Sequence, residues 1–578
     1  MNNALRMRPD GTPSQTTIFL MIVALAIIWF VPLGWRHLLP SDEGRYAEMA
    51  REMFLTGDWI TPRYNGYIYF EKPPLQTWAN ALSFAWFGIG VWQARLYTAL
   101  TGFLGILLIG FTGARIFNAK AGFYAAIALA CAPYWALMGH FNTLDMGLSF
   151  WMELALCALL LAQRNGLSPR AVRSWMWTGW AAMALAMLSK GLIGIILPGA
   201  ALVLYTFIAR DWKLWKRLHL VSGLVIFLVI VAPWFVLVQL RNPEFLHFFF
   251  IVQQFERYLT PAQQRPGPFW YFAPVLLAGF LPWLSVIARN LRDMLRVQRQ
   301  ANGFAPVTLL LVWSVFIFVF FSASHSKLMS YTLPIAPALA LIAGKYLSQL
   351  GRIEWRRHLG GYLALLVIMV PVVLMLGQHG NARTPHALYH VFMMWAFAAL
   401  GVAFVLTLFA AWWLCRYPRH AAADAVNPCA SCAAALPVSI TAFGLAWLLM
   451  TTIAGTGHDV FGRYSSGALL APAVKEALAK SPPGTPFYAV GMLDHTLPFY
   501  VGHTTILVQD PDELKFGTSI EPQKWIPTIA LWEQRWNATR HALAVMPVWR
   551  YTQLAAQGLP MQVVARDARR VVVQKPQM

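Results

Sequence analysis

Residues 17–46 decide the fold, and they read TIFLMIVALAIIWFVPLGWRHLLPSDEGRY. The part from 17 to 38 is apolar and long enough to cross a bilayer as a helix, which takes roughly 20 residues. Asp42 and Glu43 follow directly, so the chain passes at once from a membrane span to a polar segment. Because the apolar part lacks a small-residue cleavage pattern, we expect it to be retained as an anchor.

Apolar runs of this kind recur along the chain as far as Ile453 and predict thirteen membrane spans. The predicted spans are approximately 17–38, 93–114, 121–139, 144–162, 174–189, 191–209, 218–240, 268–288, 305–322, 328–347, 360–377, 392–415 and 434–453. The apolar run 74–90 is shorter, and its Pro-Pro start and tryptophans favour a helix that lies at the membrane interface. The sequence therefore predicts a mainly α-helical, polytopic membrane protein.

The composition agrees with this fold class. Of the 578 residues, 58% are hydrophobic and 12% are charged, whereas soluble domains carry about 25% charged residues. The net charge is +21, but the basic residues lie between apolar runs, which argues against nucleic-acid binding and for a role in membrane orientation. The five cysteines are too few and too badly spaced for a disulfide framework, and the Cys429-x-x-Cys432 motif lacks a second pair for a zinc site.

The distribution of charge predicts the orientation. If the N-terminus lies inside, the inner loops hold 21 Lys and Arg residues and the outer loops up to Ile453 hold ten. Acidic residues show the opposite bias, with nine outside and five inside. Since basic residues favour the cytoplasmic side, residues 40–92 are predicted to lie outside, and an odd number of spans places the C-terminus outside as well.

The pattern changes after the predicted transmembrane domain, residues 1–454. Hydropathy falls, and a helical stretch over 467–480 is followed by short strand-like segments. These segments are 487–490, 505–508, 542–546 and a hairpin-like pair around Val563 and Val572. Residues 455–578 are thus predicted to form a small soluble α/β domain, in which no motif indicates a chemical function.

Polar residues collect at the outer ends of the predicted spans. The loop 40–92 is far longer than an ordinary connection, and loops of this length are commonly functional. Cations at the mouth of an apolar bundle suit the phosphate of a lipid whose tail stays in the bilayer, and acids suit a sugar or a cationic transition state. The acids are Asp42, Glu71 and Asp145, and the cations are Arg45, Lys72, Lys190, Arg257 and Lys327.

Purely structural roles are the alternative for the first-loop residues. Ser41 could cap a helix whose first turn carries Asp42 and Glu43, because acids are favourable near a helix N-terminus. Glu71 could form an internal ion pair with Lys72 or Arg45. Adjacent residues of an extended chain point apart, however, so an ion pair between Glu71 and Lys72 would need further partners.

A series of motifs in chain order resembles the membrane glycosyltransferases of the GT-C fold that use polyprenyl-linked sugars. More narrowly, it is similar to the bacterial aminoarabinose transferases that modify lipid A. The motifs are Asp42-Glu43-x-Arg45-Tyr46, Gly57-Asp58-Trp59, Pro62-Arg63, Tyr69-Phe70-Glu71-Lys72-Pro73-Pro74 and Ser324-x-Ser326-Lys327-x-x-x-Tyr331-x-Leu333-Pro334. The resemblance covers the membrane part of the chain, and the C-terminal domain adds little to it.

The resemblance implies a reaction and a location. Undecaprenyl phosphate carrying 4-amino-4-deoxy-L-arabinose would donate its sugar to a lipid A phosphate at the periplasmic face of the bacterial inner membrane. The added cationic sugar would lower the anionic charge that polymyxin and cationic peptides seek. The implied catalytic residues are Asp42 and Asp145, and the implied donor or phosphate-binding residues are Arg45, Tyr69, Glu71, Lys72, Arg257, Lys327 and Tyr331.

We expect no required cofactor or metal, although Asp42, Glu71, His247 or His325 could hold a divalent ion adventitiously. We also expect a monomer that contacts membrane lipids and no nucleic acid. Two other functions remain open at this point. A protein O-mannosyltransferase or another polyprenyl-phosphate-sugar transferase would share the architecture and differ in its acceptor pocket. A lipid flippase or transporter would place polar groups near the membrane midplane rather than at the outer ends.

The charge distribution leads to a test of topology. Reporter fusions after Lys345 should show a cytoplasmic location, and fusions after Met578 should show a periplasmic one, because of the 21-to-ten bias in basic residues. The measurement is the activity of a paired reporter, such as alkaline phosphatase and green fluorescent protein. The opposite activity at either fusion point would contradict the predicted orientation.

Overall fold

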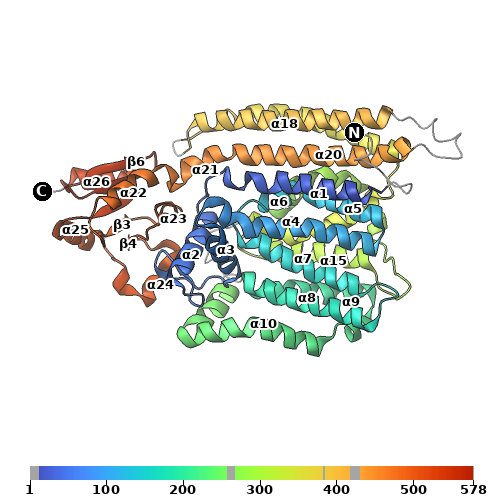
Figure 1. Cartoon of the computed structure of the whole chain (residues 1–578), viewed down its shortest axis with the longest axis horizontal. Coiled ribbons are helices and arrows are strands. Elements are labelled where there is room, and N and C mark those ends of the chain that lie inside the picture. Colours follow the sequence, from blue (N-terminus) through green and yellow to red (C-terminus); the bar gives the residue numbers. More distant parts are fainter. Residues whose placement is uncertain (1–11, 257–266, 382–383, 417–429, 577–578) are drawn as a thin grey trace.

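The structure is a computed structural model that describes residues 12–256, 267–381, 384–416 and 430–576. Long helices run side by side in a bundle, and a smaller domain with a β-sheet lies at one end of it (Figure 1). The bundle comprises α1 (Gln15–Phe30), η1 (Val31–Gly34), α4 (Val91–Ile116), α5 (Ala119–Ala130), α6 (Pro133–Met138), α7 (Leu144–Ala162), α8 (Pro169–Lys190), α9 (Ile193–Ala209), η2 (Trp212–Arg217), α10 (Leu220–Arg241), η3 (His247–Glu256), α12 (Phe272–Gly279), η4 (Leu281–Trp283), α13 (Leu284–Arg289), α14 (Leu291–Met294), α15 (Pro306–Ala323), η5 (Met329–Ile335), α16 (Ala336–Leu347), α17 (Arg352–Leu376), α18 (His386–Arg416) and α20 (Ala430–Gly457).

Each of the thirteen predicted spans contains a helix, so the mainly helical membrane fold is confirmed. Eight of the described helical segments are individually long and apolar enough to cross a membrane, and the bent pair α12 and α13 would make a ninth. The remaining predicted spans are shorter or broken. Pro133 starts α6 after the break that ends α5, and Pro282 lies at the bend between α12 and α13, because proline cannot continue a regular helix.

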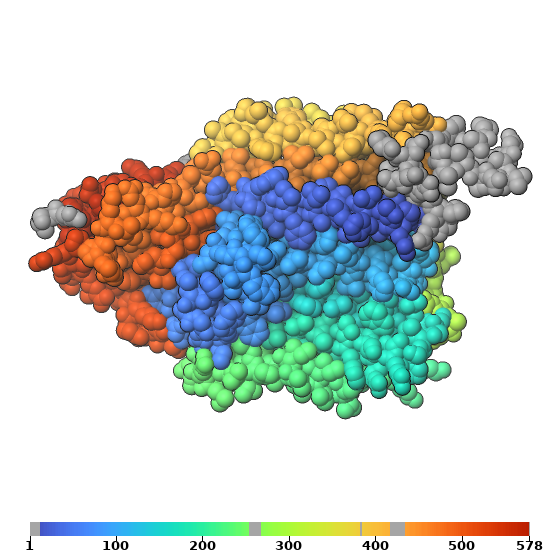
Figure 2. All heavy atoms as spheres, viewed as in Figure 1, coloured from blue at the N-terminus to red at the C-terminus, as the bar shows by residue number. Residues whose placement is uncertain are grey.

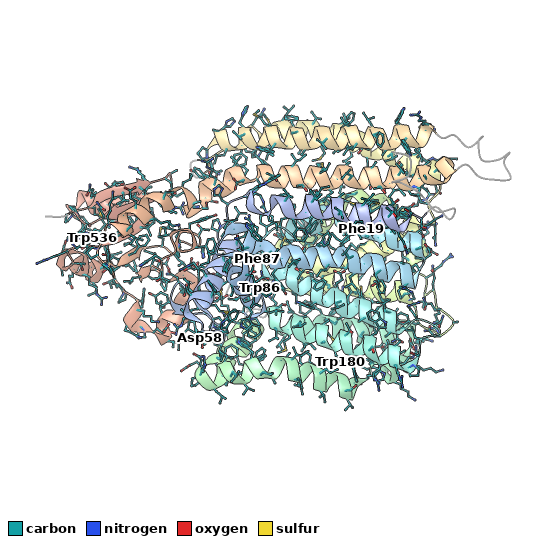
Figure 3. The ribbon with its side chains drawn as sticks, in the orientation of Figure 1. Phe19, Asp58, Trp86, Phe87, Trp180 and Trp536 are labelled. Atoms are coloured by element: carbon teal, nitrogen blue, oxygen red, sulfur yellow. The ribbon has the colours of Figure 1, made fainter. Side chains whose placement is uncertain are left out.

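The first outer loop is folded rather than extended. It forms α2 (Asp42–Thr56), a short hairpin of β1 (Arg63–Tyr64) and β2 (Tyr67–Ile68), and α3 (Leu75–Phe87). At 13 residues α3 is too short to span a bilayer, and its end carries Trp86, which is 73% exposed, and Phe87, which is 51% exposed. Figure 3 shows both side chains beside the outer end of the bundle, where interfacial aromatic residues are favourable.

The C-terminal domain contains the predicted strands. Its five-stranded sheet has the order β4-β3-β5-β7-β6; β3 is parallel to β4 and β5, and the other two pairings are antiparallel. The sheet buries Trp532 and Trp536 of α25 on one face. The elements are α21 (Asp459–Ser465), η6 (Gly467–Leu469), α22 (Ala471–Ala479), β3 (Phe487–Val490), α23 (Leu497–Val501), β4 (Ile506–Val508), η7 (Asp512–Leu514), α24 (Lys515–Ile520), η8 (Pro522–Lys524), α25 (Ile529–Ala538), β5 (Leu543–Pro547), α26 (Val548–Ala556), β6 (Gln562–Arg566) and β7 (Arg570–Gln574).

Helix α2 lies between the bundle and the C-terminal domain. Every residue from Glu43 to Met53 is buried, although the sequence of α2 is polar. Gly44 allows the close approach of the C-terminal domain, since a Cβ atom at this position would lie 2.2 Å from the carbonyl oxygen of His495. The loop and the domain also exchange hydrogen bonds between Asn65 and Thr505, and their surfaces meet in Figure 2.

A buried ion pair joins α2 to α4 and to the turn before α7. Glu43 binds Arg95 through two nitrogen–oxygen contacts of 2.7 and 2.9 Å, and both side chains are at most 2% exposed. The carboxylate of Glu43 also accepts a hydrogen bond of 3.0 Å from the backbone N–H of Asn142. Arg95 donates its remaining hydrogen bonds to the carbonyls of Leu33, Arg36 and His37. Both charges are therefore paired and hydrogen-bonded, as buried ions require.

Glu43→Gln should lower stability by about 3–5 kcal/mol, because it leaves the buried guanidinium of Arg95 without its counter-charge. The measurement is thermal unfolding of the purified protein in detergent. The matched control is Glu354→Gln, which breaks the exposed ion pair with Arg289 and should cost less than about 1 kcal/mol. Equal midpoints for the two variants would contradict a central role for the Glu43–Arg95 pair.

Candidate active site

The first group of predicted site residues surrounds Arg45. Its guanidinium lies 3.1 Å from the Asp42 carboxylate and donates a hydrogen bond of 3.0 Å to the Tyr69 hydroxyl. The third partner is Glu513 of η7, whose carboxylate lies 2.8 Å from Arg45 Nε. Arg45 is 5% exposed, so three oxygen-bearing side chains hold one buried cation.

Asp42 is the accessible member of this group. Its side chain is 32% exposed, compared with 6% for Arg45 and 19% for Glu513. Asp42 opens α2 and its neighbour Glu43 points the other way, toward Arg95. Ser41 makes no side-chain bond to the helix N-terminus, so the simple capping role of Ser41 is wrong. Arg45 therefore orients a carboxylate that a substrate can reach.

The pKa values of the surrounding groups reflect burial among several acids. Burial raises the pKa of Glu513 to about 7; Arg45 opposes this shift and Glu71 adds to it. Burial lowers the pKa of His495 to about 4, and its ring nitrogen lies 2.9 Å from the Tyr64 hydroxyl. His495 is thus neutral at pH 7, whereas Glu513 changes its charge near that pH.

Glu71 and Lys72 form the turn that follows Tyr69. Lys72 Nζ donates a hydrogen bond of 3.0 Å to the Glu71 carbonyl oxygen and lies 3.9 Å from the Glu71 carboxylate. Both side chains are nearly buried, with 11–12% exposed. Glu71 and Lys72 therefore follow directly on Tyr69 of the Asp42–Arg45 group. The distance of 3.9 Å between their charged groups is long for an ion pair.

The second group centres on Asp145 in the first turn of α7. Its carboxylate forms an ion pair with Lys190, the last residue of α8. Lys190 Nζ also lies 4.7 Å from the centre of the Tyr331 ring, a cation–π contact. Asp145 and Tyr331 are thus joined through Lys190, which we counted among the outer cations without assigning it to the site.

The two groups are linked through buried contacts. Asn142 binds Glu43 and also accepts hydrogen bonds from Gln76 and Asn80 of α3, so the turn that carries Asp145 is fixed to both first-loop helices. Leu144 packs in the same apolar cluster as Tyr46 and Tyr69. The outer ends of α7 and α8 therefore lie beside the loop that carries Asp42.

The remaining two predicted residues are not placed in either group. Lys327 donates hydrogen bonds to the carbonyl oxygens of Phe321 and Ser322 at the end of α15, and burial lowers the pKa of its ammonium group. In the described ranges its polar contacts are with these carbonyls. Arg257 lies outside the described residues. Their assignment to the donor phosphate stays a prediction.

The C-terminal domain supplies the site residue that sequence reasoning missed. Glu513 comes from a segment without a recognisable motif, and 468 positions separate it from Arg45. His495 is also part of this environment, because its ring nitrogen lies 3.5 Å from the Glu513 carboxylate. No local pattern could have identified either residue, because their proximity to Arg45 depends on how the domain docks.

Among the described residues, no group of three or more His, Cys, Asp and Glu side chains is arranged to hold a metal ion. The arrangement suits a different chemistry. Acids and cations lie around one partly exposed carboxylate, that of Asp42, which fits a sugar that leaves a phosphate. The expectation that no metal or cofactor is required stays a prediction.

Two family models match the chain. The aminoarabinose transferase C-terminal domain matches residues 470–575, which include Glu513. The dolichyl-phosphate-mannose-protein mannosyltransferase model matches residues 71–237, which include Glu71, Asp145 and Lys190. Each model thus includes some of the residues described above, whereas Asp42, Arg45 and Tyr69 lie before the first residue that the second model matches.

Individual proteins with known names match over longer stretches. An undecaprenyl phosphate-alpha-4-amino-4-deoxy-L-arabinose arabinosyl transferase of Aeromonas salmonicida is 32% identical over 67% of this chain and 69% of its own length. The enzyme of the same name from Edwardsiella ictaluri is 30% identical over 61% of this chain, and the match spans 65% of that protein. The crystal structure of ArnT from Cupriavidus metallidurans bound to undecaprenyl phosphate has a TM-score of 0.90 at 40% identity, over 97% of this chain and 98% of that chain.

Glu513→Gln should change how stability depends on pH. A carboxyl group whose pKa is raised from its unfolded value to about 7 stabilises the fold at low pH and loses that contribution as the pH rises through 7. The variant cannot ionise, so its melting temperature relative to the unaltered protein should rise between pH 5 and pH 8. The pKa of Glu52 is also raised, to about 8, but Glu52 titrates in both proteins. Its effect on the melting temperature is therefore the same in both and does not change the difference.

Differential scanning fluorimetry in detergent at several pH values measures this difference. Glu476→Gln in the same domain is the control, since its side chain is 67% exposed and should leave the pH dependence nearly unchanged. If the melting temperatures of Glu513→Gln and of the unaltered protein changed equally with pH, this result would contradict the buried placement of Glu513.

Proposed function

The chain belongs to the family of undecaprenyl phosphate-4-amino-4-deoxy-L-arabinose arabinosyl transferases, and we propose that it transfers this aminosugar from undecaprenyl phosphate to a phosphate of lipid A. The reaction takes place at the periplasmic face of the inner membrane. The observation that carries the proposal is the placement of Glu513. The domain that matches the aminoarabinose transferase model reaches into the group around Asp42 and completes it.

The proposed transfer exchanges one bond at the anomeric carbon. The bond between this carbon and the oxygen of undecaprenyl phosphate breaks, and a new bond forms to an oxygen of the lipid A phosphate. The acceptor is already anionic at neutral pH, so no side chain has to remove a proton from it. The protein instead has to hold two phosphates close together and to stabilise positive charge on the sugar ring in the transition state.

Asp42 is suited to stabilise the positive charge of the sugar. It is the accessible carboxylate of its group, and Arg45 fixes its orientation from the side. The oxocarbenium-like ring and the amino group of the sugar are both cationic, and a fixed carboxylate attracts either one. Arg45 itself is paired with Asp42 and Glu513 and donates a hydrogen bond to Tyr69, so we assign it to positioning rather than to the donor phosphate.

The phosphates require cations, and two lysines lie at the site. Lys72 follows Tyr69 and Glu71 on the loop, and Lys190 lies at the end of α8 with Asp145 and Tyr331. We assign Lys72 to the departing undecaprenyl phosphate, because it closely follows Tyr69, whose hydroxyl binds Arg45 of the Asp42 group. The pair of Asp145 and Lys190 presents a second charged pair at the outer end of the bundle, where the acceptor phosphate can approach.

The match to the mannosyltransferase model suggests a protein acceptor as the competing function. A protein hydroxyl would need a general base, whereas a phosphate acceptor does not. The two functions are therefore distinguished by product. Purified protein, a synthetic undecaprenyl-phosphate aminosugar and lipid A should yield modified lipid A without any protein acceptor, and sugar transfer in this defined mixture also excludes a transporter.

Asp42→Asn should reduce transfer to lipid A by on the order of 100-fold, since it keeps the shape of the side chain but removes the charge. Asp145→Asn should have a similar effect because it releases Lys190. The measurement is mass spectrometry of lipid A from cells that carry each variant. Asp58→Asn is the control, because this partly exposed acid pairs with Arg241 away from the site and should leave modification intact.

Protein levels in the membrane must be equal for the comparison to count. A fully active Asp42→Asn protein would mean that hydrogen bonding at this position suffices and that its charge has no part in the transfer. If all three variants lost activity equally, the loss would reflect a general disturbance of the outer loop instead of the proposed site.

A further inference from the structure

A hollow lies at the outer end of the bundle, between η1, the end of α6 and the outer end of α20. Its empty space, together with the open solvent at its mouth, amounts to about 340 Å³. Its lining includes Pro32, Arg36, Leu137, Phe141 and Thr451. None of the residues assigned to the transfer reaction lines it. Figure 1 shows α1, α6 and α20 close together on the side of the bundle away from α10.

The hollow contains a buried guanidinium with unused donors. Arg36 is 7% exposed, and it stacks over the Phe141 ring at 4.4 Å. Among the described residues its one hydrogen-bond acceptor is the carbonyl oxygen of His140, at 2.5 Å from Nη2. The donors on Nε and Nη1 therefore lack a partner from the described protein, and a buried guanidinium is costly unless its donors are satisfied.

A second polar group in the same hollow is also unsatisfied. Thr451 is 6% exposed, and its hydroxyl has no hydrogen-bond partner in the described part of the chain. The neighbouring hydroxyls of Thr452 and Thr456 both donate to carbonyls of their own helix, as is usual for threonine in a membrane helix. An oxygen-rich ligand between Arg36 and Thr451 would satisfy both.

The charges around Arg36 indicate an anionic ligand. The two nearby acids are already committed, Glu43 to Arg95 and Asp459 to His37. Arg36 keeps its positive charge, since an arginine side chain is not deprotonated in proteins. A planar guanidinium that presents parallel N–H donors matches the geometry of a phosphate.

The position of the hollow indicates the source of that phosphate. Its walls are the outer ends of membrane helices, and its rim carries apolar side chains such as Leu137, which is 37% exposed. Val31 and Trp35 beside it are 52% and 59% exposed. A ligand that enters here comes from the bilayer and keeps its acyl chains among these apolar side chains.

We propose that the hollow at Arg36 and Thr451 is a binding site for the phosphate head group of an anionic membrane lipid, separate from the site around Asp42. The lipid phosphate accepts hydrogen bonds from the free donors of Arg36 and from the Thr451 hydroxyl. Lipid A and phosphatidylglycerol both carry this chemistry. A bound lipid also ties α1 to α20, the helix that leads into the C-terminal domain.

Lipid titrations of the purified, delipidated full-length protein test the proposal. Native mass spectrometry measures the affinity for phosphatidylglycerol, for lipid A and for diacylglycerol, which lacks a phosphate. We expect saturable binding of at least one phosphate-bearing lipid and none of diacylglycerol. Arg36→Gln should weaken that binding about tenfold, because it removes a charge-assisted contact, and Thr451→Val should weaken it by a smaller factor.

Two matched variants serve as controls. Arg241→Gln removes an arginine at the outer end of α10, and Thr407→Val removes another buried hydroxyl without a described partner, in α18. Both should bind lipid like the unaltered protein. If Arg36→Gln does not fold, Arg36→Lys keeps the charge but loses the planar fork, and weaker binding is expected there too.

The arms of the experiment separate the two sources of phosphate. Weakened binding of lipid A alone identifies the hollow as a subsite for the acceptor, and equal weakening for phosphatidylglycerol identifies a site for bulk anionic lipid; either result supports the proposal. Unchanged affinity in both Arg36→Gln and Thr451→Val, or the absence of saturable binding to any phosphate-bearing lipid, would overturn it.

Discussion

The buried ion pair between Glu43 and Arg95 is the constraint on which the outer half of the molecule depends. Two opposite charges at most 2% exposed are tolerable only because each also has hydrogen-bond partners from different elements. Those partners are Leu33 of η1, Leu39 in the segment before α2, and Asn142 in the turn before α7. The need to satisfy two buried charges thus sets the relative positions of the segments that carry Asp42 and Asp145.

The Asp-Glu motif at the start of α2 consists of two neighbouring carboxylates with different partners. Successive residues on a helix point in directions about 100° apart, so Glu43 can face the bundle while Asp42 stays partly exposed. Glu43 is bound by Arg95 and Asn142, whereas Asp42 is partly exposed and pairs with Arg45. Two adjacent carboxylates thus have different environments, one buried within the fold and the other open to a ligand.

The C-terminal domain is a part of the site rather than an appendage. Its Glu513 closes the group around Arg45, and its backbone lies against α2 so closely that Gly44 is required there. Glu513 has a pKa of about 7 because it is buried among other acids. Docking of this domain thus adds one partner to Arg45 and one titratable carboxyl group near Asp42.

The sequence by itself determined the membrane class, the helical segments and the strands of the outer domain, because hydropathy and its periodicity act locally along the chain. Their position at the outer ends of spans and the resemblance to a family also predicted Asp42, Arg45, Tyr69, Glu71, Lys72 and Asp145 as site residues, and their roles stay a prediction. Only the tertiary structure decided which of these residues meet. Lys190 became the partner of Asp145, Glu513 joined Arg45, and Ser41 lost its capping role. The physical reason is that ion pairs form between residues far apart in the chain, and their partners follow from helix packing and domain docking rather than from any local pattern.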